Sequence, residues 1–221
     1  MYKSGNQNEY FSELFICRLG EKLGFDMAHY ESDDGYIRSK NFTDGTPYNF
    51  EPASSIVGEN EDYGDCFDAI NAISPVLAEQ YLRIIWLDTI CYNMDRHTEN
   101  FGFLRDIHTG EIVSMAPNYD NNIALISRGY PSGTSREHDG IIRFFREFVQ
   151  SNETAKTMLK EMELPTATKA MLDECFDEIP IEADRDFIKA FILNGQNAVR
   201  SIIDEDISET EDEERGFGLM L

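Results

Sequence analysis

The sequence predicts a mainly α-helical protein with small β elements, an α+β fold. Several segments carry apolar residues at helical spacing, and the longest covers residues 75–93. Two short apolar runs, at residues 101–104 and 111–115, flank a polar stretch with a turn at Thr109 and Gly110, which predicts a β-hairpin. With 221 residues and 41% hydrophobic content, the chain is long enough to bury a core.

The N-terminal part, residues 1–40, is predicted to contain one helix and short strands. The helix covers residues 8–23, with apolar side chains along a broad face and Gly24 at the position that commonly ends a helix. Short strands are expected at residues 28–30 and 36–39, on either side of a turn.

The next segment, residues 41–74, is predicted to be a polar loop. Its first part is rich in Gly, Asp, Glu, Asn and Pro, and loops of such length are typically functional or mobile. The helix at 75–93 follows, with Ser74 as N-cap and Pro75 at the first helical position. Because this helix is apolar on much of its circumference, we expect it to be the buried centre of the fold.

Further helices and an acidic tail complete the prediction. Residues 127–140 contain Gly, Pro, Ser and Thr, and we expect a flexible loop in which Ser132, Thr134 or Ser135 could accept phosphate. Residues 205–221 are expected to form an acidic tail. The predicted helices cover residues 140–149, 155–162, 166–175 and 183–203.

A set of polar residues on either side of the predicted hairpin suggests a function. Residues 95–100 read DRHTEN, and Asn118-Tyr119-Asp120 follows the hairpin. Phosphoryl transfer from a nucleotide needs an acidic side chain to orient the attacking hydroxyl, and an amide and a second carboxylate to hold magnesium. Asp95, Asn100 and Asp120 supply this set, and the hairpin would bring Asn100 and Asp120 side by side.

These motifs resemble those of the HipA-like bacterial serine/threonine kinases. The DRHxxN order at residues 95–100, the APxYD order at 116–120 and the helix opened by Asn8-Glu9-Tyr10 are all similar to that family, over residues 3–122. Phosphoinositide lipid kinases share DRHxxN, but their second loop is normally Asp-Phe-Gly. The resemblance implies a protein-kinase-like C-lobe over residues 75–204, built around the catalytic-loop hairpin.

The resemblance also implies a role for each site residue. Asp95 would be the catalytic base or orient the hydroxyl, and His97 would brace its loop. Asn100 and Asp120 would bind Mg²⁺, and Lys3 with Glu9 or Glu13 would form the ion pair that clamps the ATP phosphates.

The part of the fold that covers ATP is expected to differ from the family. Only Met1 and Tyr2 precede Lys3, so the usual glycine-rich loop is not expected ahead of it. The sequence therefore predicts a reduced or missing N-lobe, which a partner chain could complete.

Charge and composition restrict the partners. With 42 acidic and 19 basic side chains the net charge is −23, which disfavours direct nucleic-acid binding. The acidic surface is first of all a common means of keeping a protein soluble, and it is also compatible with a basic protein substrate. No apolar run approaches the ~20 residues that span a bilayer, and no signal peptide is recognised. The four cysteines lack metal or redox spacing, so we expect reduced thiols in a cytoplasmic protein.

Three functions remain open from the sequence. The favoured one is an ATP- and Mg²⁺-dependent kinase that acts on a protein hydroxyl, and the family's association with toxin-antitoxin systems suggests growth inhibition as a role. The second is a non-catalytic, kinase-derived module that binds a protein. The third is a small-molecule or lipid kinase.

Overall fold

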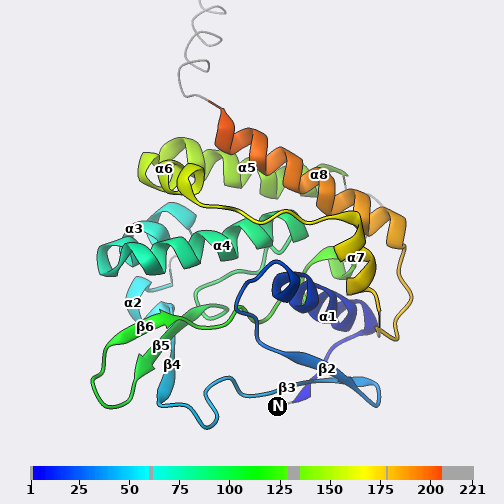
Figure 1. Cartoon of the computed structure of the whole chain (residues 1–221), viewed down its shortest axis with the longest axis horizontal. Helices are drawn as coiled ribbons and strands as arrows, with labels where there is room; N and C mark the ends of the chain where they lie inside the picture. Colours follow the sequence, from blue (N-terminus) through cyan, green and yellow to red (C-terminus); the bar gives the residue numbers. More distant parts are fainter. Residues whose placement is uncertain (1, 60–61, 129–134, 178, 206–221) are drawn as a thin grey trace, which may run out of the picture.

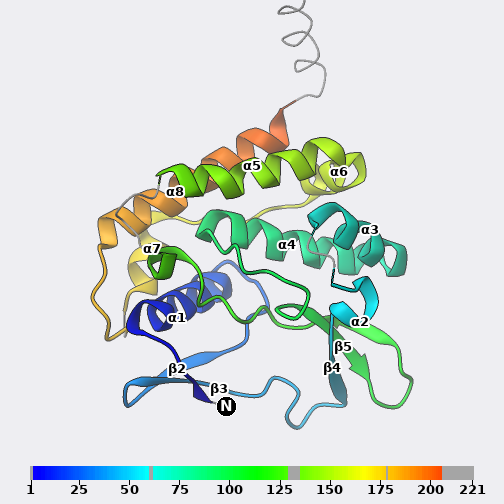
Figure 2. The ribbon, with the colours of Figure 1, turned by 180° about the vertical axis from the view of Figure 1, so that it is seen from behind.

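Layers of helices lie over two small antiparallel sheets in the computed structural model (Figure 1). The structure describes residues 2–59, 62–128, 135–177 and 179–205. The view from behind shows the same order, with the sheets on the side opposite the C-terminal helices (Figure 2). The predicted fold class, mainly α with small β elements, is therefore confirmed.

The N-terminal part, up to residue 39, consists of one helix and a sheet of three short strands. The elements are β1 (Tyr2–Lys3), α1 (Gln7–Lys22), β2 (Tyr30–Asp33) and β3 (Tyr36–Ser39), with strand order β1-β3-β2. Helix α1 begins in a capping box, in which the Asn6 side chain accepts from the Glu9 backbone and Glu9 accepts from the Asn6 N–H. Gly24 follows the helix with φ +80°, a conformation that glycine adopts without strain.

The first strand of the β2–β3 hairpin lies later in the chain than predicted. Asp34 and Gly35 both have positive φ, 45° and 85°, as a two-residue hairpin turn requires. Residues 28–30 were predicted as the strand, but the backbone N–H of Ala28 donates to the Asn118 carbonyl at 2.8 Å and only Tyr30 enters β2. The predicted boundary is wrong because this backbone pairs with a segment 90 residues away.

The predicted loop 41–74 contains a strand and two helices. The elements are β4 (Tyr48–Pro52), α2 (Ser54–Val57) and α3 (Tyr63–Ile73). Strand β4 forms through pairing with β5, more than 50 residues later, and local patterning gives little sign of it. Helix α3 buries Cys66, Phe67 and Ile70 and packs along the next helix. The prediction of a loop over this whole segment is therefore wrong.

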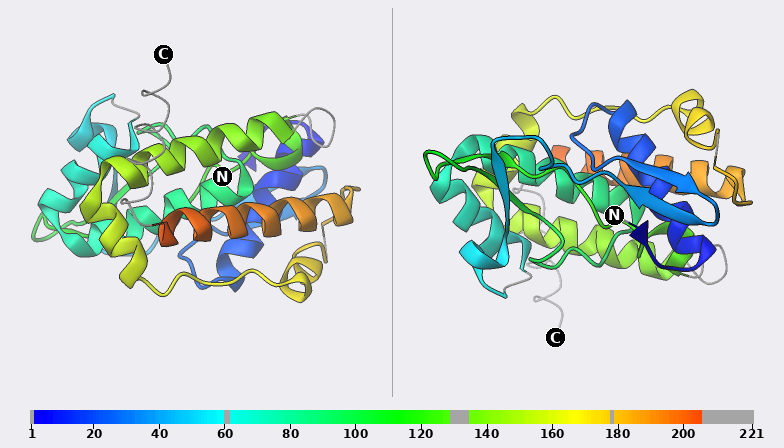
Figure 3. Two further views of the ribbon diagram at one scale, coloured as in Figure 1. Left: turned by 90° about the horizontal axis from the view of Figure 1, so that it is seen from above. Right: turned by 90° about the horizontal axis from the view of Figure 1, so that it is seen from below.

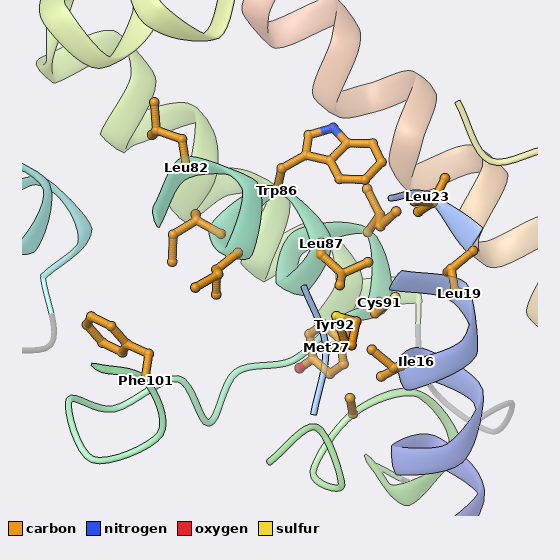
Figure 4. Packing of buried hydrophobic residues seen from close by; sticks show 14 of the residues in the cluster. Ile16, Leu19, Leu23, Met27, Leu82, Trp86, Leu87, Cys91, Tyr92 and Phe101 are labelled. Carbon is orange, nitrogen blue, oxygen red and sulfur yellow. The ribbon is translucent and has the colours of Figure 1, made fainter. Parts of the chain in front are cut away.

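Helix α4 (Pro75–Cys91) forms the centre of the core, as predicted. Ser74 caps it by accepting from the Val76 N–H at 3.2 Å, and Pro75 occupies its first turn. Figure 4 shows side chains of α4 packed near those of α1. The helix ends at Cys91, two residues before the predicted end, and the C-cap residue Tyr92 is left-handed with φ 56°. The side chains labelled in Figure 4 include Trp86, Leu87 and Cys91 from α4 and Ile16, Leu19 and Leu23 from the α1 side.

The predicted hairpin is present and extends the sheet that β4 begins. Strands β5 (Gly102–Asp106) and β6 (Ile112–Met115) pair antiparallel, and the strand order is β4-β5-β6. In the turn, the Asp106 carboxylate accepts from the backbone N–H groups of Thr109 and His108, and these bonds lower its pKa.

The C-terminal part contains α5 (Ser135–Ser151), α6 (Glu153–Glu161), α7 (Lys169–Cys175) and α8 (Arg185–Asp204), preceded by a short 3₁₀ turn, η1 (Leu125–Arg128). Helices α5, α6 and α8 cover α4 on the side away from the sheets, and α7 packs on α1 (Figure 1). Seen from above, α5 and α8 run side by side (Figure 3). None of the helices in the described ranges is long and apolar enough to cross a membrane.

Two predictions fall on residues that the structure does not describe. Ser132 and Thr134 lie outside the described residues, and so does the predicted acidic tail from residue 206 onward. Ser135 is the first residue of α5, so this helix begins five residues before the predicted boundary.

Candidate active site

A buried arginine holds the two predicted site loops together. Arg96, from the DRH motif, forms a bidentate ion pair with Asp88 of α4, with both N–O distances 2.8 Å. Its guanidinium also donates to the carbonyls of Asn100 and Tyr119 at 2.6 and 2.7 Å. Further bonds reach the side-chain oxygens of Asn118 and Asn121. One side chain therefore joins α4 and the loops 92–100 and 116–121.

Asp88 stabilises the charged form of Arg96. Burial by itself disfavours the ion, but Asp88, through its charge and its hydrogen bonds, raises the pKa of Arg96 above the usual arginine value. Both side chains are about 1% exposed. A buried pair of this kind requires its partner groups to be in place, so it couples the positions of the two loops.

Asp95 and Asn100 lie on one tight loop. The Asn100 amide nitrogen donates to the Asp95 backbone carbonyl at 2.7 Å, and the Asn100 N–H donates to the His97 carbonyl at 2.8 Å. Because the bond to Asp95 uses the amide's donor side, the amide oxygen is the atom of Asn100 that could coordinate a cation. Asn100 is buried, while Asp95 is half-buried.

Lys3 connects Asp120 to helix α1. Its ammonium contacts Glu13 at 2.5 Å and also contacts the Asp120 carboxylate. The second oxygen of Glu13 accepts from the Asn121 N–H at 2.9 Å, so this buried carboxylate supports both Lys3 and the Asp120 loop. Of the two predicted partners of Lys3, the structure places Glu13 there, because Glu9 forms the exposed capping box of α1 instead.

Asp120 has an unusual backbone conformation. Its φ of 61° lies in the left-handed region, which costs energy for residues other than glycine and is often found at functional sites. The Asp120 N–H donates to the Tyr30 hydroxyl at 3.4 Å, and the Lys3 ammonium lies 5.9 Å from the Tyr30 ring centre. Burial raises the pKa of Tyr30, so the phenol stays neutral beside these charges.

His97 lies in the same loop as Asp95. Its Nδ1 accepts from the Glu99 N–H at 3.3 Å, which is the contact a bracing histidine would use. The bracing role itself stays a prediction.

A cavity of about 500 Å³ opens beside Lys3 and Asp120. Residues 39–43, which lead from β3 toward β4, form part of its wall. Three aromatic rings cluster there, with centroid separations of 5.6 to 6.0 Å between Phe42, Phe50 and Tyr119. The cavity therefore combines flat apolar walls with a lysine and a carboxylate at one end, a combination suited to a nucleotide.

A second cavity, of about 530 Å³, contains Asp95 and His97. Its other walls come from the start of α3 and from α5. Of the predicted site residues, Lys3 and Asp120 line the first cavity and Asp95 and His97 line the second, whereas Asn100 lines neither.

A comparison with known protein families decides the family. The model of the HipA-like C-terminal domain matches residues 2–181. The chain belongs to the HipA-like family. The resemblance predicted from residues 3–122 is therefore confirmed, and it extends further along the chain.

The HipA-like chain has the fold of a solved kinase. The crystal structure of the Helicobacter pylori proinflammatory kinase CtkA superimposes with a TM-score of 0.69 at 20% sequence identity, over 98% of this chain and 91% of that one. HipA of Shewanella oneidensis MR-1, from the structure with HipB and operator DNA, gives a TM-score of 0.49 at 12% identity, over 91% of this chain and 56% of that one. No curated protein matches the sequence significantly.

Sequence reasoning missed several residues of this HipA-like site. Arg96 and Asp88 form its central ion pair, and the aromatic residues Phe42 and Phe50 form a wall of the Asp120 cavity. A signal existed for Asp88, because it is an acidic residue within a helix that is otherwise largely apolar. Phe42 and Phe50 were visible only as two apolar residues in a polar segment.

Proposed function

We propose that this HipA-like protein transfers the terminal phosphate of ATP, with Mg²⁺, to a serine or threonine hydroxyl of a protein. The observation that carries the proposal is that Arg96 joins the loop of Asp95 and Asn100 to the loop of Asp120. Asp120 and Lys3 line the cavity suited to a nucleotide, and Asp95 lines another one. Phosphoryl transfer needs the hydroxyl-orienting acid and the nucleotide-binding groups to be held on opposite sides of the transferred phosphate.

The oxygen donors fit a magnesium ion. Asn100 presents an amide oxygen and Asp120 a carboxylate, the hard ligands that Mg²⁺ prefers. When bound, the ion neutralises phosphate charge, which matters for a protein with net charge −23. Lys3 now contacts Asp120, so nucleotide binding would replace this contact by one between Lys3 and a phosphate, while Glu13 keeps the ammonium in position.

The remaining residues would position the acceptor. Asp95 would accept a hydrogen bond from the hydroxyl and take its proton as the oxygen bonds to phosphorus and the bond to ADP breaks. Arg96 touches neither reactant and would act by holding the two loops in register. Binding of Mg²⁺-ATP without phosphate transfer would instead indicate the non-catalytic module. A role in a toxin-antitoxin pair stays a prediction.

Paired substitutions test the two halves of the site. Asp120→Asn should weaken Mg²⁺-ATP binding in calorimetry by about tenfold or more, the size of one lost charge-assisted contact. Asp95→Asn should leave that binding in place and lower the rate of phosphate transfer by about 10²- to 10⁴-fold.

Asp34→Asn is the matched control. Asp34 is also an aspartate with positive φ, 45°, but it lies exposed in the β2–β3 turn. It should bind and transfer like the wild type. Equal binding and activity in all four proteins would refute the site assignment, and a wild type that binds no Mg²⁺-ATP would refute the proposed function.

A further inference from the structure

The cavity around Asp95 has a chemistry of its own. Its walls come from three places: the N-terminus of α3, the loop around Asp95, and the face of α5 that carries Phe144, Glu147 and Phe148. Helices α3 and α5 are held together there by edge-on contacts of Phe148 with Tyr63 and with Phe67, at 6.1 and 6.0 Å. The walls are therefore fixed by the core.

Acidic groups dominate the charge of this cavity. The carboxylates of Asp62, Asp95 and Glu147 line it. Among its described lining residues, Arg96 is the only arginine or lysine, and its guanidinium is fully engaged with Asp88 and the two site loops. Arg143 approaches Glu147 at 3.6 Å, but both side chains are more than 60% exposed and such a pair is weak.

Exposed apolar side chains lie among these carboxylates. Met94 and Phe144 line the cavity and are 41% and 42% exposed. Lysine and arginine side chains combine a long apolar stem with a terminal charge, so they can cover such surface while the charge reaches a carboxylate. Arg143 already lies over the Phe144 ring, 5.5 Å from its centre, which shows that a guanidinium is accommodated on this aromatic surface.

We propose that this cavity selects the acceptor segment of the substrate protein and that the segment carries an arginine or lysine beside the phosphorylated serine or threonine. The basic side chain packs on Phe144 and Met94 and pairs with Glu147. This inference rests on the proposed function, because it takes Asp95 as the place of the acceptor hydroxyl. The net charge of −23 acts in the same direction, since it attracts basic segments and repels acidic ones.

Phosphate transfer to a peptide library tests the inference. Peptides with a central serine and with arginine, alanine or glutamate at each flanking position are incubated with the full chain and Mg²⁺-ATP. The wild type should prefer arginine at one position or more. Glu147→Gln should lower the ratio of rates for the arginine and alanine peptides by about three- to fivefold, the size of one partly exposed ion pair.

Glu111→Gln is the charge-matched control. Glu111 is exposed in the β5–β6 turn and does not line the cavity, so the ratio should stay at the wild-type value. Transfer without preference for basic peptides, or an equal ratio in wild type and Glu147→Gln, would overturn the inference and leave the proposed function standing.

Direct binding tests the surface even if no phosphate is transferred. A fluorescent arginine-containing peptide should bind the wild type more tightly than its glutamate counterpart, and Glu147→Gln should reduce this difference while Glu111→Gln does not. Equal binding of the two peptides to the wild type would refute the docking surface. Loss of transfer with intact selective binding would count against the proposed function alone.

Discussion

Arg96 shows how one residue determines the geometry of the site. It lies next to Asp95 in sequence and lines the same cavity, yet its guanidinium bonds to Asp88, Asn118 and Asn121. Its bonds to backbone carbonyls reach both loops. The Asp-Arg-His order thus combines a residue proposed for chemistry with a residue that positions it.

Loss of Arg96 should destabilise the fold strongly. Arg96→Met leaves Asp88 buried without its counter-charge, and this should cost about 3–5 kcal/mol of unfolding free energy in urea denaturation. Because a buried pair can often be replaced by apolar residues, the double variant Arg96→Met, Asp88→Leu should recover part of that loss.

A partly exposed pair provides the control for Arg96. Arg83 pairs with Glu79 one turn away on α4, with side chains 31% and 44% exposed. Arg83→Met should change stability by only about 0.3–0.5 kcal/mol. A similar small loss for Arg96→Met would mean that the Asp88 pair does not stabilise the two loops.

At the scale of elements, β4 connects the wall of the Asp120 cavity with the segment that follows Asp95. It comes after residues 39–43 of that wall, pairs with β5, and leads into α2, at whose start two N–H groups bond to residues 98 and 101. The Ala53 and Ser54 N–H groups donate to the carbonyls of Phe101 and Thr98, at 3.0 and 3.1 Å. A shift of β4 would therefore move both the wall of the Asp120 cavity and the segment that follows Asp95.

Gly102 allows β4 and β5 to approach closely. A Cβ at this position would meet the Glu51 carbonyl and lie 2.9 Å from the Pro52 Cα, so the backbone would have to move. Gly102→Ala should cost about 1–3 kcal/mol. It should also weaken Mg²⁺-ATP binding, because the Gly102 carbonyl accepts from the Ala116 N–H at the start of the Asp120 loop.

Replacing Gly140 by alanine is expected to stabilise the protein, in contrast to the same change at Gly102. Gly140 lies in α5, and an added Cβ would meet nothing within 4 Å. Gly140→Ala should stabilise the protein by about 0.5–1 kcal/mol through helix propensity. Thermal unfolding of both variants checks the pair, and equal effects would mean that the close strand approach at Gly102 is unimportant.

The molecule as a whole carries a charge of −23, and this charge opposes compactness. Salt screens repulsion among exposed carboxylates, with a Debye length that falls from about 30 Å at 0.01 M to about 8 Å at 0.15 M. We therefore expect the melting temperature to rise with NaCl over this range. The same titration at about pH 5, where Asp and Glu begin to take up protons, should show a smaller rise. A melting temperature that falls with salt at neutral pH would contradict the expectation.

The fold class, the α4 helix with its Ser74 cap and the β5–β6 hairpin were predictable from the sequence. Each depends on residues close together in the chain, where periodicity and capping act directly. The same holds for Asp95 and Asn100, which share one loop. The DRH and APNYD motifs also predicted the family. The match of the family model over 180 of the 221 residues confirms it.

Tertiary structure decided what joins distant parts of the chain. Lys3 and Asp120 are 117 residues apart, and the choice of Glu13 over Glu9 depends on which face of α1 is buried against the Asp120 loop. Strand β4 exists through pairing with β5, and the two cavities arise only where these segments meet. Local sequence specifies local conformation, whereas contacts across the chain depend on how all the apolar faces pack at once, and that is a property of the complete fold.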